Sequence, residues 1–114
     1  MVVAQGEIWW ADLPDAAGSG PGFRRPVVIV QGEAFNRSNI ATVVCVPLTT
    51  NLRLAQAPGN LLLPARASEL AKDSVANVSQ IVTIDRDLLT ERAGRVSRSQ
   101  LEAILDGIDI VLGR

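Results

Sequence analysis

The sequence predicts a mainly β protein with helices (α+β), in which a small, strongly curved antiparallel sheet or barrel is closed by a C-terminal amphipathic helix. Short segments rich in Val, Ile and Leu recur along the chain between Gly, Pro, Asn and Asp, a pattern typical of short strands joined by turns. The last segment instead repeats its apolar residues every three or four positions, which is the period of a helix. With 114 residues, 47% of them hydrophobic, the chain is expected to form a single domain over residues 1–114.

Seven segments carry the strand pattern. They are Gly6–Leu13, Pro26–Gln31, Thr42–Leu48, Leu61–Pro64, Ser74–Val78, Gln80–Ile84 and Gly94–Val96. Their regular spacing favours antiparallel neighbours over parallel βαβ units. Trp9 and Trp10 are adjacent on the first segment, so their side chains should point to opposite faces of the sheet, with at least one in the core. A single helical turn is expected after Glu33 and a short helix over Arg66–Lys72.

The C-terminal helix is predicted from one apolar stripe. The stripe consists of Leu101, Ile104, Leu105, Ile108, Val111 and Leu112. Two capping boxes could begin this helix, Ser97 with Gln100 or Ser99 with Glu102. The helix is expected to serve packing rather than chemistry.

The types of residue present exclude several kinds of chemistry. Histidine is absent and cysteine occurs once, which excludes His-based triads, a paired-imidazole ribonuclease site and a structural zinc site. The single Cys45 cannot form an internal disulfide, which fits a reducing cytoplasm, and its apolar neighbours favour a buried side chain over a nucleophile. No apolar run is long enough for a membrane span, and the first residues lack the regions of a signal peptide. The expected location is therefore the cytoplasm, without membrane contact.

Arginine dominates the basic residues and is unevenly distributed. The formal net charge of −1 argues mildly against a nucleic-acid partner. Residues 21–66, however, hold five arginines and one glutamate, and a local positive face can steer RNA to an acidic protein. Scattered solubilising charge is the alternative interpretation.

A glycine-rich loop leads into two arginines at the start of a predicted strand. Residues 18–30 read GSGPGFRRPVVIV; glycine permits close approach of a charged ligand, and the forked guanidinium of Arg24 or Arg25 suits phosphate. A second polar segment, Thr49-Thr50-Asn51, ends the strand that begins at Thr42, and its hydroxyl and amide groups can hold phosphate or base edges. Together they predict an anion site, with a plain hairpin connection and a plain strand end as the alternatives.

Arginine and hydroxyl donors suffice for one reaction in particular. RNA carries its own nucleophile, the 2′-hydroxyl, so a protein need only fix an in-line geometry and stabilise charge around phosphorus. The carboxylate pairs Asp12/Asp15 and Asp85/Asp87 lie beside turn signals and are a weak indication of Mg²⁺. The residues alone thus leave a Mg²⁺ site open, and they carry no nucleotide-cofactor motif such as a Walker loop or GxGxxG.

Five segments, in order and at matching spacing, resemble the MazF/PemK (Kid) toxins of bacterial toxin–antitoxin systems. They are Gly6–Leu13, Gly18-Ser19, Arg25–Val28, Val44–Thr50 and Gln80–Asp85. The resemblance implies an SH3-like small β-barrel (CcdB/PemK-like) with added helices, and a homodimer. It also implies metal-independent, sequence-specific cleavage of single-stranded RNA into 2′,3′-cyclic phosphate and 5′-hydroxyl ends. A cognate MazE-like antitoxin is implied as partner, with its C-terminal segment blocking the RNA groove.

By position, the resemblance assigns catalysis to Arg25 and Thr49. Arg25 would neutralise charge and supply a proton at the scissile phosphate, and Thr49 would hydrogen-bond it; Arg24 is the alternative if the loop register differs. Further RNA contacts are implied for Gly18, Ser19, Arg24, Asn36, Thr50, Asn51, Arg53 and Gln80. Many members carry Glu after the Gly-Ser pair, where this chain has Gly20, so no loop carboxylate is assigned an acid–base role.

Three other functions compete with the endoribonuclease. A CcdB-like gyrase-poisoning toxin shares the fold and cleaves nothing, but it has no need of an Arg25–Thr49 pair. A PIN-domain toxin cuts RNA with Mg²⁺ in an α/β fold, which the strand-rich pattern disfavours. An inactive adaptor would only bind an antitoxin, and normal growth on induced expression would indicate it.

Overall fold

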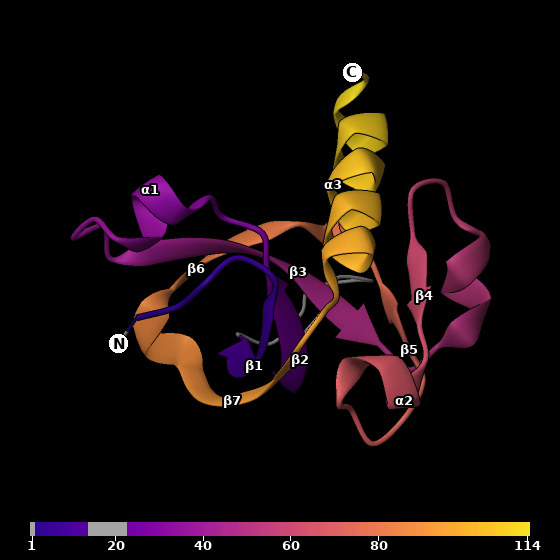
Figure 1. The fold of residues 1–114 in the computed structure, drawn as a ribbon, viewed down its shortest axis with the longest axis horizontal. Helices are drawn as coiled ribbons and strands as arrows, with labels where there is room; N and C mark the ends of the chain where they lie inside the picture. Colours follow the sequence, from indigo (N-terminus) through magenta and orange to yellow (C-terminus); the bar gives the residue numbers. More distant parts are fainter. Residues whose placement is uncertain (1, 14–22) are drawn as a thin grey trace.

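The strands form one curled sheet in the computed structural model of the protein, which describes residues 2–13 and 23–114 (Figure 1). They are β1 (Glu7–Leu13), β2 (Phe23–Ile29), β3 (Thr42–Thr49), β4 (Leu61–Leu63), β5 (Ser74–Ala76), β6 (Val82–Asp85) and β7 (Leu89–Arg95). Across the sheet their order is β4-β5-β3-β2-β1-β7, and β6 pairs with β3. The ladders between these strands are antiparallel. The predicted mainly β class is confirmed, and the sheet lacks the parallel ladders that the PIN-domain alternative would require.

Strand β3 is shared by three neighbours. One edge pairs with β2, with Val27 opposite Pro47 and Ile29 opposite Cys45. Cys45 also pairs with Val82 of β6, so β6 lies along the opposite edge of β3. Beyond Pro47, the end of β3 pairs with β5 instead. The last residues of β3 therefore lie where its pairing changes from β2 and β6 to β5.

Alternating side chains give the sheet a core on each face. One buried cluster contains Ile8, Val28, Val46, Leu48, Ile104 and Ile108, and it includes the inner side of the C-terminal helix. The other contains Val3, Ala11, Val27, Ile29, Val43 and Cys45, with Trp9 packed against it. Successive residues of β2 fall into opposite clusters, as the two-residue period of a strand requires. The predicted core position of one tryptophan is met by Trp9, while Trp10 lies under an arginine described below.

The helix α3 (Arg98–Leu112) stands on the sheet (Figure 1). The Ser97 hydroxyl accepts from the Gln100 backbone N–H, and the Gln100 side chain accepts from the Ser97 backbone N–H. The first of the two predicted capping boxes is thus the one formed, and it satisfies two of the four free N–H groups at the helix start. Gly113 ends the helix with a left-handed φ of 74°. In the part of the chain that the structure describes, the helices are too short or too polar to cross a bilayer.

Several predicted boundaries were wrong. The short helices are α1 (Glu33–Asn36), α2 (Ala65–Ser68), η1 (Leu52–Gln56), η2 (Val78–Gln80) and η3 (Arg86–Leu88). Helix α2 stops before the predicted Lys72 because Glu69 adopts a left-handed φ of 64°. Strand β7 begins at Leu89 rather than Gly94, since an edge strand with exposed polar side chains lacks an apolar pattern. Strand β2 begins at Phe23 rather than Pro26, because this part of β2 pairs only with β1 and a proline is tolerated at such an edge.

Candidate functional site

Arg25 and Thr49 both lie beyond the point where the β2–β3 ladder ends. The last paired residues are Val27 and Pro47, and two residues further along each antiparallel strand are Arg25 and Thr49. Pro26, the next residue of β2, has no N–H to continue the ladder toward β3, and the carbonyl of Pro47 instead accepts from the Asn77 N–H. The Arg25 side chain crosses the gap between the two strand ends, and its Nη1 donates to the Leu48 carbonyl at 3.4 Å. The structure therefore brings the guanidinium to the residue next to Thr49.

The guanidinium of Arg25 retains unused donor capacity. Arg25 is half-buried, and its Nε is buried with no hydrogen-bond partner among the described atoms. Buried donors are nearly always paired in folded proteins, and exceptions tend to mark functional groups. A phosphate placed at this gap would offer two oxygens, one to accept from Nε–H and one to accept from an Nη–H group.

Thr49 begins a polar segment that curls away from the sheet. Its hydroxyl accepts from the Asn51 backbone N–H at 3.2 Å, and the Asn51 side chain in turn accepts from the Arg53 backbone N–H at 3.3 Å, capping η1. Thr49 is half-buried, while Thr50, Asn51 and Arg53 are exposed. Hydroxyl, amide and guanidinium groups are thus presented to solvent in sequence, starting from the residue after the carbonyl that Arg25 reaches.

Arg24 is engaged elsewhere. It lies 4.5 Å over the Trp10 ring and its Nη2 donates to Glu91 of β7 at 2.9 Å. An ion pair and a cation–π contact hold its charge on the β1–β7 side of β2. The geometry therefore favours Arg25 over Arg24 as the arginine of this site.

The other predicted RNA-contact residues are distributed unevenly. Gln80 is half-buried and ends η2, which is tied to β3 by the Asn77 N–H donating to the Pro47 carbonyl. Asn36 is only 2% exposed, and its amide is taken up by Gln31 and Glu33. This burial does not support the predicted RNA contact of Asn36, whose role in the structure is to hold α1. Gly18 and Ser19 lie outside the described residues.

The same Asn36 network affects one titrating group. The Glu33 carboxylate accepts from the Gln5 backbone N–H at 2.6 Å and from the Asn36 side chain at 3.0 Å. These bonds, the first above all, lower the pKa of Glu33 below its usual value. The carboxylate therefore stays charged and structural at neutral pH.

Cys45 behaves as predicted. It is fully buried, and burial raises the pKa of its thiol to about 12. A thiol that stays protonated at neutral pH is not a nucleophile. Over residues 2–13 and 23–114, no group of three Asp, Glu or Cys side chains gathers in a way that could hold a metal ion.

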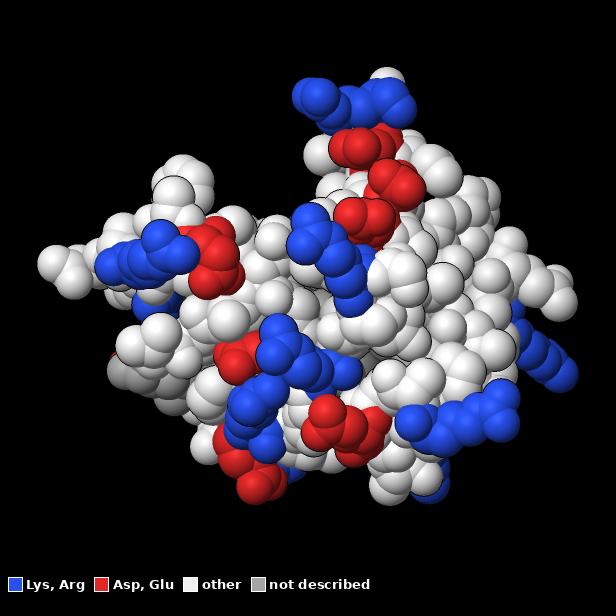
Figure 2. Space-filling model, in the orientation of Figure 1, with Lys and Arg blue, Asp and Glu red and all other residues white. Residues whose placement is uncertain are grey.

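The predicted positive face is not one surface. Helix α1, next to Arg37, lies at the opposite end of the molecule from α2, which carries Arg66 (Figure 1). On the side seen in Figure 2, basic and acidic side chains alternate, and acidic ones follow α3. The exposed acidic residues of that helix are Glu102, Asp106 and Asp109. Attraction of an anion to this site therefore rests on Arg25 and Arg53 rather than on a wide positive patch.

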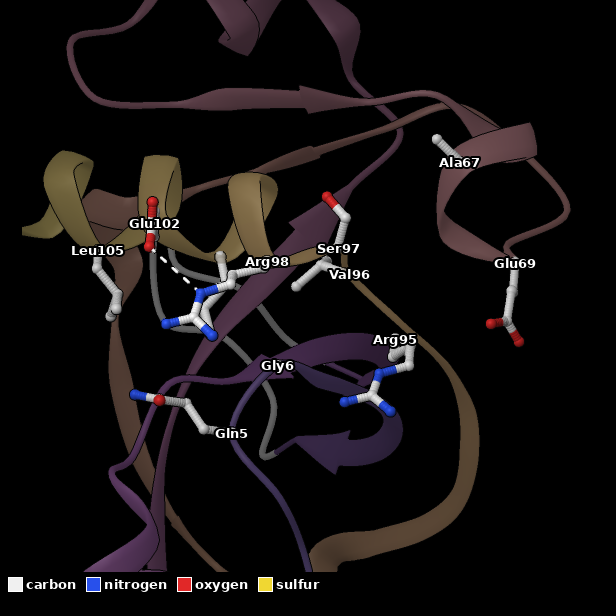
Figure 3. A pocket seen from close by; sticks show the side chains of 11 residues that line it. Gln5, Gly6, Ala67, Glu69, Arg95, Val96, Ser97, Arg98, Glu102 and Leu105 are labelled. Carbon is white, nitrogen blue, oxygen red and sulfur yellow. Dashed lines mark ion pairs between the residues drawn. The ribbon is translucent and has the colours of Figure 1, made fainter.

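A sizeable cavity among the described residues lies elsewhere. It measures about 710 Å³ between α2, the end of β7 and the start of α3, and neither Arg25 nor Thr49 lines it. Figure 3 shows Arg95 and Arg98 beside Glu69 and Glu102 in this cavity, with an Arg98–Glu102 ion pair at 3.7 Å. Its mixed charges largely neutralise one another. An extended single strand needs an open rim rather than a closed cavity, so cavity size does not locate the site.

Comparisons with known proteins identify the relatives of this chain. The family profile described as PemK-like, MazF-like toxin of type II toxin–antitoxin system matches residues 4–112. Endoribonuclease MazF6 of Mycobacterium tuberculosis strain H37Rv is 44% identical over 112 residues, covering 98% of each chain. A mycobacterial endoribonuclease solved in complex with its cognate antitoxin is 25% identical with a TM-score of 0.71, covering 98% of this chain and 94% of that one. MazF of Deinococcus radiodurans, at 21% identity and a TM-score of 0.83, covers 100% and 99% and shares the fold.

Proposed function

The chain belongs to the PemK-like, MazF-like toxin family of type II toxin–antitoxin systems, and from this premise we propose that it is a sequence-specific, metal-independent endoribonuclease acting on single-stranded RNA. The observation that carries the proposal is the half-buried Arg25, which reaches to the Leu48 carbonyl beside Thr49 with its Nε unpartnered. Relatives named endoribonucleases support this function. They give no support to the gyrase-poisoning alternative.

The reaction uses the nucleophile of the substrate. The 2′-oxygen attacks the adjacent phosphorus and loses its proton, while the bond from phosphorus to the 5′-oxygen breaks and that oxygen gains a proton. Arg25 stabilises the added negative charge and donates toward the leaving oxygen, and the Thr49 hydroxyl hydrogen-bonds the phosphate. The products are a 2′,3′-cyclic phosphate and a 5′-hydroxyl. None of these steps calls for a metal ion or a cofactor.

The RNA is proposed to follow the polar segment after β3. Thr50, Asn51 and Arg53 are exposed on it, and Gln80 lies on η2, an element that packs against β3. Amide and guanidinium groups can read the edges of splayed single-stranded bases. Gly18 and Ser19, in the loop that leads to Arg25, complete the proposed contact set.

The test is cleavage of RNA with and without a chelator. Purified protein is incubated with total RNA in excess EDTA, and the cut ends are mapped and treated with phosphatase and kinase. We expect cuts at one short sequence word, 5′-hydroxyl ends that a kinase labels directly, and the same rate in EDTA as in Mg²⁺. Loss of cleavage in EDTA with rescue by Mg²⁺ would assign a metal-dependent mechanism instead.

The toxin is proposed to act in the cytoplasm as one domain over residues 1–114, with a cognate MazE-like antitoxin as its partner. The family description and the mycobacterial relative solved with its antitoxin support this partner. An antitoxin segment that occupies the rim around Arg25 would exclude RNA. Co-expression of a cognate antitoxin should therefore restore growth.

We further propose that the protein is a homodimer. An apolar groove of about 460 Å³ runs between α1 and α3, lined by Val30, Phe35, Ile40, Val44, Leu105 and Ile108 among others. Val111 and Leu112 stand one turn beyond Ile108 on the same side of α3 and are 40% and 63% exposed. A second copy is the occupant that the family resemblance implies.

Phe35→Glu should convert the dimer into a monomer. Phe35 is 60% exposed at the edge of this groove, so a charge placed there would be buried without a partner in the dimer. Light scattering after size exclusion measures the change. Leu62→Glu is the control, because Leu62 is 44% exposed on β4 and lies outside the groove. If the Phe35→Glu protein remained a dimer, the dimer interface would have to lie on another surface.

A further inference from the structure

The side chain of Asn60 holds the far end of the segment that carries Arg53. Asn60 Nδ2 donates to the Leu54 carbonyl of η1 at 2.8 Å and to the Asn77 side chain at 3.2 Å. Its Oδ1 accepts from the Val78 backbone N–H at 2.9 Å. Three of the four hydrogen-bonding positions of this amide are therefore used, and all three tie η1 to η2 and its cap.

The hydrogen bonds of Asn60 lead back to the end of β3. Asn77, which accepts from Asn60, donates its backbone N–H to the Pro47 carbonyl at 3.0 Å. Pro47 lies two residues before Thr49 on β3. From Thr49 the chain runs through the Asn51 cap and Arg53 to Leu54. There the Asn60 side chain donates to the Leu54 carbonyl, so this series of bonds begins and ends at the same segment. The exposed residues between Thr49 and Leu54 are thus anchored at both ends of the segment.

The turn that presents Asn60 rests directly on α3. A Cβ at Gly59 would lie 2.8 Å from the Gly107 carbonyl oxygen, and a Cβ at Gly107 would lie 2.1 Å from the Gly59 carbonyl oxygen. The two main chains touch without side chains between them. Because a helix backbone is far stiffer than a surface loop, this contact gives Asn60 a rigid support.

We propose that Asn60 is a positioning residue for RNA binding, which fixes η1 so that the Arg53 guanidinium meets the substrate in one place. The inference rests on the proposed function and adds a residue that need not touch RNA itself. A fixed donor loses less conformational entropy on binding than a mobile one. The contribution of Asn60 therefore falls on substrate affinity rather than on the chemical step.

Asn60→Asp is the variant that tests the proposal. A carboxylate keeps the acceptor for the Val78 N–H but can no longer donate to Leu54 or Asn77. We expect KM for an RNA oligonucleotide containing the cut word to rise about tenfold, the equivalent of one charge-assisted hydrogen bond, with kcat unchanged. Gln56→Glu is the matched control: it adds the same charge on η1, at an exposed side chain, and should change KM by less than about twofold.

A double-mutant cycle separates positioning from general damage. If Asn60 acts through Arg53, Asn60→Asp should raise KM about tenfold in the native background and by less than about twofold in the Arg53→Ala background. Equal KM increases in the two backgrounds would overturn the proposal, and so would an unchanged KM in Asn60→Asp. Native protein that cleaves no RNA would instead contradict the proposed function.

Hydrogen exchange gives a measurement that does not depend on RNA. The Ala57 N–H donates to the Leu54 carbonyl, and the Leu54 N–H to the Asn51 carbonyl. Both amides should exchange at least about tenfold faster in Asn60→Asp, whereas those of β1 should not change. If Asn60→Asp fails to fold, Asn77→Ala removes one of the two acceptors of Asn60 and should raise KM in the same direction by a smaller factor. Unchanged exchange at Leu54 and Ala57, or an unchanged KM in folded Asn77→Ala, would also overturn the proposal.

Discussion

Arg25→Ala should lower kcat for RNA cleavage by about 10²–10³-fold while the protein stays folded. The guanidinium is the group placed to stabilise charge beside Thr49, and its Nε has no partner to lose. Within residues 2–13 and 23–114, the substitution removes one side-chain hydrogen bond, a long one of 3.4 Å to the Leu48 carbonyl. Steady-state cleavage of a fluorogenic RNA measures the effect, and thermal unfolding monitors the fold. Induced expression of the Arg25→Ala protein should also no longer arrest growth.

Arg24→Ala is the matched control for this prediction. It removes the same charge one residue away, together with the ion pair to Glu91 and the contact over Trp10. We expect cleavage within about threefold of native, since exposed ion pairs contribute little, and a small loss of stability. Full activity in a folded Arg25→Ala protein, or a comparable loss in Arg24→Ala, would remove Arg25 from its proposed role.

The approach of Arg25 to the end of β3, beside Thr49, could be predicted from the sequence because both residues lie at the ends of strands with clear apolar patterns. Val27–Ile29 and Val43–Val46 read as neighbouring antiparallel strands, and antiparallel pairing brings the start of one beside the end of the other. The C-terminal helix was predictable for a similar reason, since its apolar stripe and the Ser97 cap are local signals.

The contacts of individual polar side chains could not be predicted, because they depend on which way each side chain faces in the folded protein. The Arg25–Pro26 adjacency favours Arg25, but the local sequence does not show what Arg24 contacts; that depends on Glu91 of the distant strand β7 and on the ring of Trp10. Asn36 reads as an exposed turn residue, yet it is buried by contacts with Gln31 and Glu33. The role of Asn60 in holding η1 could not be predicted from the sequence, because all three of its hydrogen-bond partners are set by tertiary packing.

Gly107→Ala should destabilise the protein by about 2–3 kcal/mol, the usual range for overpacking at a rigid contact. Replacing Gly by Ala inside a helix ordinarily stabilises it by roughly 0.5–1 kcal/mol. Here the added Cβ would come within 2.1 Å of the Gly59 carbonyl oxygen, and a backbone atom cannot rotate away. The sign of the effect is therefore opposite to that of helix propensity. Denaturant unfolding at fixed protein concentration measures it.

Gly32→Ala is the control, because a Cβ there meets nothing within 4 Å and should change stability by less than about 0.5 kcal/mol. The same Gly107→Ala protein also tests the support under Asn60. If the added Cβ displaces the turn at Gly59 from α3, Asn60 moves with that turn. KM for RNA should then rise, although Gly107 lies far along the chain from Arg53. If the Gly107→Ala protein were more stable than native, the turn at Gly59 would move away from α3 at little energetic cost. Asn60 would then lack the rigid base from which it positions η1.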